Sequence, residues 1–125
     1  MQRLRTIQFT ALLVFSMQPS AANPATELNW SSVHLEGMTL QLVSPKAKGD
    51  SEELHFGKGT MSATYCSGGM CTGPLTVWKI ENNRLKVGYA PTEGDVLVEF
   101  TAKKLVLRHP DGKVFVYSII SQSGT

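Results

Sequence analysis

LTVWKIENNRLKVGY, residues 75–89, is the stretch of sequence that predicts the fold most clearly. It divides into a β-rich run over Leu75–Glu81, the pair Asn82-Asn83, and a second run over Arg84–Tyr89. Asparagine tolerates a positive φ better than most residues, so two asparagines between two such runs suit a tight two-residue loop. We therefore expect a β-hairpin here.

The two strands of this expected hairpin differ in their pattern. Residues 84–89 alternate between polar and apolar side chains, which predicts one buried face with Leu85, Val87 and Tyr89 and one wet face. Residues 75–81 are apolar on both faces, with Trp78 and Ile80 sharing one of them. Such a strand either lies in a covered position or exposes an apolar patch for binding.

The rest of the chain continues with short β-type runs that are separated by turn residues. This spacing is typical of a meander, sandwich or barrel. We expect an all-β domain, a single small antiparallel meander barrel or sandwich of about seven or eight strands, in which a closed barrel would remove exposed edges. The expected runs, besides the hairpin, are Met38–Val43, Leu54–Phe56, Thr60–Tyr65, Val96–Phe100, Leu105–Arg108 and Lys113–Ile120.

Residues 1–22 have the order of a cleaved secretory signal peptide. Arg3 and Arg5 precede the apolar run Phe9–Met17, and small residues follow up to Ala22, after which we expect cleavage. The apolar run is about half of the roughly 20 residues that a membrane-spanning helix needs. We therefore expect an exported protein, periplasmic or secreted, without stable membrane insertion.

The mature chain is then one β domain over residues 23–125. Residues 23–36 form an N-terminal extension in which Glu27–Glu36 suits one short helix. With Arg3 and Arg5 removed, ten Lys and Arg remain against ten Asp and Glu, and the two signs are interleaved. Nucleic-acid binding depends on a concentrated positive field, so this class of partner is excluded.

Cys66 and Cys71 enclose Ser67-Gly68-Gly69-Met70 in a chain predicted to reach an oxidising compartment. A disulfide that closes a tight hairpin is the plain interpretation. The alternative is a soft-metal site, because two thiolates with Met70 would suit Cu(I). A redox-active pair would favour Cys-x-x-Cys spacing at a helix start, which is absent. We expect no cofactor and no bound metal.

Catalytic motifs are missing from the sequence. His34, His55 and His109 are scattered singly, and neither Gly-x-Ser-x-Gly nor His-Glu-x-x-His occurs. The pair Glu52-Glu53 is expected in the polar loop Lys46–Glu53, where it would keep a sheet edge solvated. The sequence names no catalytic residue, so an enzyme is the less favoured class.

One family resemblance can be drawn from three features of the chain. Trp30 precedes Leu35-Glu36-Gly37-Met38-Thr39-Leu40 at the expected first strand, repeated hairpins follow, and His109-Pro110-Asp111-Gly112 forms a late turn. In this order the chain resembles the small bacterial lipocalin-like (calycin-type) β-barrel domains. The resemblance implies a small meander barrel whose interior holds a ligand or whose surface binds a partner.

Our leading hypothesis is an exported, non-enzymatic binding protein of the cell envelope that engages a protein partner or a small apolar ligand. Trp78, Ile80, Met70 and Gly69 are the candidate binding residues. One alternative is a periplasmic copper or redox protein that uses Cys66, Cys71 and Met70. Another is an inhibitor of an envelope hydrolase that inserts the hairpin tip, residues 67–70, into a cleft.

Overall fold

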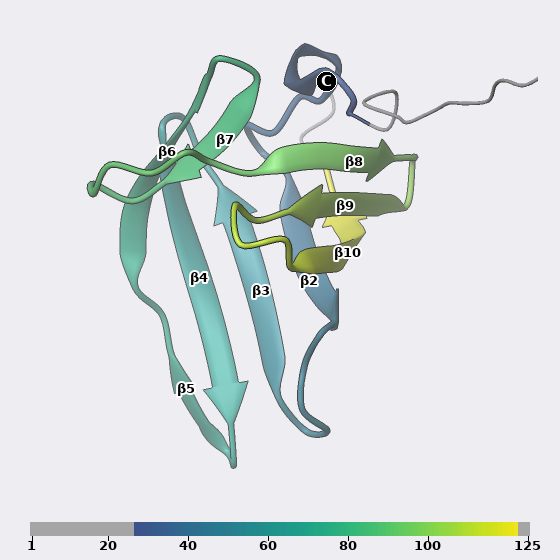
Figure 1. The fold of residues 1–125 in the computed structure, drawn as a ribbon. Coiled ribbons are helices and arrows are strands. Elements are labelled where there is room, and N and C mark those ends of the chain that lie inside the picture. The colour runs from purple at the N-terminus through teal and green to yellow at the C-terminus, as the bar shows by residue number, and fades with distance from the viewer. Residues whose placement is uncertain (1–26, 123–125) are drawn as a thin grey trace, which may run out of the picture.

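The computed structural model describes residues 27–122 as a single antiparallel sheet that is curled into a barrel (Figure 1). One 3-10 helix, η5 (Trp30–Ser32), precedes the strands. The nine strands are β2 (Thr39–Ser44), β3 (Ser51–Phe56), β4 (Thr60–Ser67), β5 (Met70–Thr72), β6 (Leu75–Glu81), β7 (Arg84–Val87), β8 (Val96–Phe100), β9 (Lys104–Arg108) and β10 (Val114–Ser121).

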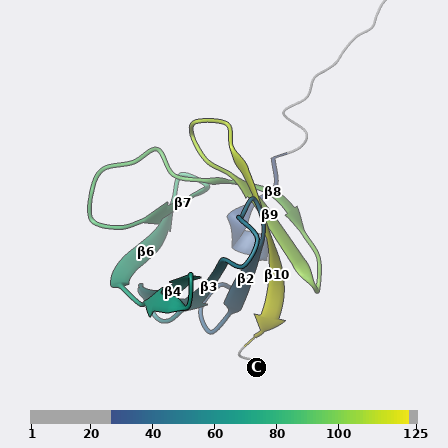
Figure 2. The same ribbon diagram turned by 90° about the horizontal axis from the view of Figure 1, so that it is seen from below.

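The strand order is β7-β6-β4-β3-β2-β10-β9-β8, with the short β5 paired to β4. Most neighbours are joined by local hairpins, and β2 pairs with β10 from the far end of the chain. At the seam, the backbone N–H groups of Leu85 and Asp95 each donate to the other residue's carbonyl, at 3.0 and 2.8 Å. The barrel is thus nearly closed (Figure 2), which confirms the predicted all-β class and decides for the barrel over the sandwich.

The hairpin predicted at residues 75–89 is confirmed, although its second strand is shorter than expected. Asn82 and Asn83 have φ of 54° and 59° and turn the chain between β6 and β7. β7 ends at Val87, because Gly88 takes a φ of 98° and breaks the alternation. Tyr89 is 82% exposed and does not share the buried face of Leu85, so that part of the prediction was wrong.

The chain around Glu52 also differs from the prediction. β3 begins at Ser51, so Glu52 and Glu53 lie in a strand and not in the expected polar loop. Backbone pairing with β4 extends along the whole of β3, up to Ser51 opposite Cys66. Long-range pairing therefore outweighs the local polar composition that indicated a loop. Successive residues point to opposite faces, so the two glutamates are separated by the sheet.

The predicted disulfide joins Cys66 of β4 to Cys71 of β5, which are directly opposed in the hairpin. Gly68 and Gly69 form the turn between them, with φ of 60° and 82°. The positive φ values explain why two glycines stand at this tip, since other residues are strained there. In Figure 1 this hairpin extends beyond the other strands.

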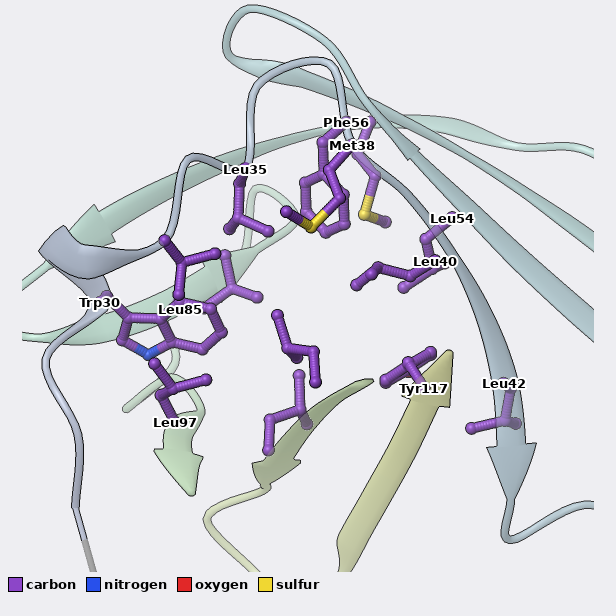
Figure 3. Packing of buried hydrophobic residues seen from close by; sticks show 14 of the residues in the cluster. Trp30, Leu35, Met38, Leu40, Leu42, Leu54, Phe56, Leu85, Leu97 and Tyr117 are labelled. Atoms are coloured by element: carbon purple, nitrogen blue, oxygen red, sulfur yellow. The ribbon is translucent and has the colours of Figure 1, made fainter. Parts of the chain in front are cut away.

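The barrel has two unlike ends. We call the end with η5 and the β6–β7 turn the closed end, and the opposite end, toward which the β4–β5 turn extends, the open end (Figure 1). At the closed end the Trp30 side chain is 1% exposed and its indole N–H donates to the Asp95 carbonyl at 2.9 Å. Figure 3 shows its ring beside Leu85 and Leu97. Burial of such a ring anchors the N-terminal segment to the barrel.

Asn83 ties the same segment to the β6–β7 turn. Its side-chain oxygen accepts the Trp30 backbone N–H at 2.8 Å, and its amide donates to the Leu28 carbonyl at 3.1 Å. Asn83 was predicted because asparagine suits the backbone conformation of the turn. It therefore also holds the N-terminal segment that fills the closed end; we call this segment the plug and these two hydrogen bonds the clamp. Asn29 begins η5 as its N-cap, accepting from the Ser31 backbone N–H at 2.9 Å.

The predicted signal peptide and its cleavage after Ala22 lie outside residues 27–122 and stay predictions. Within residues 27–122, no helix has the length and apolar character needed to span a bilayer.

Candidate functional site

A cavity of about 540 Å³ lies inside the barrel, and its lining extends from Leu85 and Asp95 at the seam to Pro110 and Asp111 in the β9–β10 turn. Its floor is apolar and belongs to the core, while polar and titratable groups stand among its walls. This combination is typical of small-molecule sites. The apolar and aliphatic lining is Leu40, Leu54, Phe56, Met61, Leu85, Val87, Leu107 and Pro110, and the polar lining is Glu52, Tyr65, Thr92, Asp95, His109, Asp111 and Tyr117.

The position of the cavity follows from the register of the strands. Leu105 and Leu97 are fully buried at the closed half of the core, and neither lines the cavity. Leu107, two residues further along β9, does line it, and His109 lies beyond the end of that strand. The interior is therefore filled with side chains on one side and hollow on the other.

Glu52 and Tyr117 meet across the cavity wall. The Tyr117 hydroxyl of β10 donates to the Glu52 carboxylate of β3 at 3.2 Å. Tyr65 lies opposite Glu52 in the β3–β4 pairing, so a second phenol flanks the same carboxylate. Burial raises the pKa of Glu52, against the lowering effects of the Tyr117 hydrogen bond and of His109. Burial, followed by the nearby Glu52 charge, raises the pKa of Tyr117 well above its usual value.

Asp95 and His109 form a second polar pair at the cavity. Oδ1 of Asp95 lies 2.6 Å from Nδ1 of His109, and the imidazole packs on Phe115 with ring centroids 4.1 Å apart. Burial raises the pKa of Asp95, and its hydrogen bond to His109 opposes that rise. The tight contact fixes the orientation of both side chains.

A second cavity of about 520 Å³ adjoins the first at the open end. The two share Glu52 and Tyr65 as lining residues, and the second continues toward the disulfide hairpin, where Cys66 and Met70 contribute to its wall. Glu52 therefore stands at the junction of a deep apolar chamber and a shallower space beside the hairpin.

The candidate binding residues predicted from the sequence are not gathered in one place. Trp78 packs edge-on against Phe56, with centroids 5.5 Å apart, and donates its indole N–H to the Gly57 carbonyl at 2.9 Å. Ile80 is 39% exposed, and neither residue lines the two cavities. Met70 is 78% exposed and does border the second cavity, next to Gly69 in the hairpin turn.

The copper alternative needs two thiolates, and the disulfide between Cys66 and Cys71 removes both. Within residues 27–122, no three His, Cys, Asp or Glu side chains are grouped as metal ligands would be. His55 faces the outside of β3, where it lies 3.0 Å from Glu53. His109 is the histidine that the fold brings to the cavity.

Sequence reasoning missed Glu52, Tyr117 and Asp95 as members of one site. A signal for Glu52 was present, because it stands two residues before Leu54 and four before Phe56, on the inward face of an extended strand. Tyr117 and Asp95 lie far from it in sequence, and pairing of β2 with β10 is needed to bring Tyr117 close.

Comparison with protein-family profiles, with curated proteins and with solved structures gives no match to this chain.

Proposed function

We propose that this protein is an exported, lipocalin-like binding protein of the cell envelope that holds a small apolar ligand inside its barrel. The observation that carries the proposal is the cavity of about 540 Å³, whose floor is the hydrophobic core itself. Ligand cavities of roughly 300–1,000 Å³ with an apolar lining and a few polar groups are the usual sites for small molecules.

The composition of the walls supports binding over catalysis. Asp95 and His109 engage each other, and Glu52 engages Tyr117, so four of the titratable groups of the cavity are held in two pairs. Pre-positioned groups of this kind orient a ligand at low entropic cost. The apolar floor supplies most of the affinity, since burial of apolar surface is its main source.

The test is the binding of a neutral, environment-sensitive dye, N-phenyl-1-naphthylamine, to the purified protein. We expect its fluorescence to rise saturably on entering the cavity. Val87 lines the cavity and is half-buried, so Val87→Trp should fill part of the space and abolish most of that rise.

The matched control is Val43→Trp. Val43 is 49% exposed on β2, away from both cavities, so the same change there should leave dye binding intact. A dye that fails to bind the folded wild type, or that binds Val87→Trp and the wild type equally, contradicts the proposal.

A second candidate function is a protein contact through the hairpin tip. Met70 is 78% exposed on a hairpin that the Cys66–Cys71 disulfide constrains. A constrained loop with an apolar tip loses little entropy when it enters a partner's cleft. In pull-down experiments with envelope extracts, Met70→Asp should remove a partner that Val43→Asp retains.

A further inference from the structure

We propose that the ligand carries a positively charged group, such as an organic ammonium, and that Glu52 is the residue that pairs with it. This inference rests on the proposed function, because it assigns the chemistry of a ligand to the same cavity.

The first argument is the charge of the lining. Three carboxylate residues, Glu52, Asp95 and Asp111, border the cavity, and no lysine or arginine of the described range does. His109 is the one lining side chain able to carry a positive charge, and it lies against Asp95 at 2.6 Å. An anionic ligand such as a fatty acid would meet uncompensated negative charge here, whereas a cation is attracted.

The second argument is that the three carboxylates are not equally available. Asp95 is engaged by His109, and Asp111 accepts the Lys113 backbone N–H at 2.9 Å within its own turn. Within residues 27–122, Glu52 receives one neutral hydrogen bond, from Tyr117, and takes part in no ion pair. Its remaining lone pairs are free to accept from a ligand.

The third argument is the surroundings of Glu52. Tyr65 lies opposite it on β4, and the Tyr117 hydroxyl of β10 donates to it, so two tyrosines border the carboxylate. A carboxylate next to an exposed tyrosine such as Tyr65 suits an ammonium group, which can gain both ion pairing and cation–π attraction. The half-buried position strengthens this attraction, because the local dielectric is lower than that of water.

The position of Glu52 also fixes how the ligand would lie. It lines both cavities, so a cation held there can direct an apolar tail onto the floor formed by Leu54 and Phe56. The second cavity, whose charged lining besides Glu52 is Asp50 and Lys46, leaves room for further substituents near the hairpin. The expected occupant is therefore an amphiphile with an apolar tail and a cationic head.

The experiment compares three probes with the same chain, n-octylammonium, 1-octanol and n-octanesulfonate, as competitors of N-phenyl-1-naphthylamine on the wild-type protein at neutral pH. We expect n-octylammonium to compete at a concentration at least about tenfold lower than n-octanesulfonate, with 1-octanol between them. Dye binding that is displaced equally by all three probes overturns the charge assignment while leaving the proposed function standing. If the dye does not bind to the wild-type protein, both the charge assignment and the proposed function are overturned.

Variants at position 52 then locate the selectivity. Glu52→Gln should weaken n-octylammonium about tenfold relative to 1-octanol, and Glu52→Lys should reverse the preference toward n-octanesulfonate. Glu53→Gln is the matched control, because Glu53 lies one residue away on the outer face and pairs with His55. Equal losses in Glu52→Gln and Glu53→Gln would overturn the role of Glu52.

Discussion

At the closed end of the barrel, Trp30 is 1% exposed and both of its N–H groups have partners, in Asn83 and in the Asp95 carbonyl. At the open end, Glu52 is half-buried, and among the described residues it receives one hydrogen bond, from Tyr117. The same strands form both ends. A filled, hydrogen-bonded end stabilises the fold, whereas a hollow end with a partly desolvated carboxylate costs stability, which is the usual balance between scaffold and site.

The largest effect should come from emptying the closed end. Trp30→Ala removes the plug and leaves a large void, so we expect the free energy of unfolding to fall by about 3–5 kcal/mol. Urea denaturation at neutral pH measures it. Leu75→Ala, at a site that is 71% exposed, is the control and should change little. Similar losses in the two variants would mean that Trp30 does not anchor the barrel.

The disulfide hairpin at the open end should contribute less. Replacing Cys66 and Cys71 by alanine releases a short loop, and the loop-entropy model gives about 2 kcal/mol for such a ring. The first cavity is not lined by either cysteine, so the affinity for N-phenyl-1-naphthylamine should stay the same. Urea denaturation and dye titration of the double variant check both parts, and a loss of dye binding with the fold intact would show that the hairpin supports the chamber.

A smaller loss of stability is expected when the hydrogen bonds between Asn83 and the N-terminal segment are removed. Asn83→Ala deletes the acceptor for the Trp30 backbone N–H and places alanine at a φ of 59°, so stability should fall by about 1–2 kcal/mol. Asn82→Ala is the matched control, since it places the same residue at a similar φ of 54° and leaves the acceptor for Trp30 in place, so it should cost less. Thermal unfolding of the two variants separates the clamp from the turn, and equal melting temperatures would contradict the clamp.

The smallest expected change in stability is a gain, and it comes from replacing Glu52. Burial raises the pKa of Glu52 above 4.5, against the opposing contributions of Tyr117 and His109, so the fold binds this proton more tightly than the unfolded chain does. The free energy of unfolding therefore falls as the pH rises from the pKa of Glu52 in the unfolded chain through its pKa in the folded protein. Glu52→Gln should melt higher than the wild type at neutral pH, and the gain should vanish at a pH below the unfolded pKa.

Melting temperatures measured across the acid range test this prediction, with Glu53→Gln as the outward-facing control. The same gain in both glutamine variants would show that general surface charge is responsible. Asp95 retains its own raised pKa in either variant, so part of the pH dependence should persist.

Much of the architecture could be predicted from local sequence. The Asn82-Asn83 turn, the Cys66–Cys71 hairpin and the strand Val96–Phe100 all rest on residues close in the chain, where turn chemistry and alternation act. The start of β3 could not be read in the same way. Its polar residues resemble a loop until β4 supplies the pairing partner.

The candidate site depends even more on pairing between strands that are distant in the sequence. Glu52 and Tyr117 are 65 residues apart, and they meet because β2, which pairs with both β3 and β10, lies between their strands. Trp78 and Ile80 were predicted for binding from their strand alone. In the barrel, Trp78 packs against Phe56 and so belongs to the wall.

The sequence by itself determined the all-β class, the two tight hairpins and the inward face of β7, because these depend on backbone preferences and on a period of two residues. Only the tertiary structure decided that the sheet closes, that Trp30 fills one end, and that Glu52, Tyr117, Asp95 and His109 surround the hollow at the other. The reason is physical. A cavity is defined by which distant strands become neighbours, and that choice depends on the packing of the whole core.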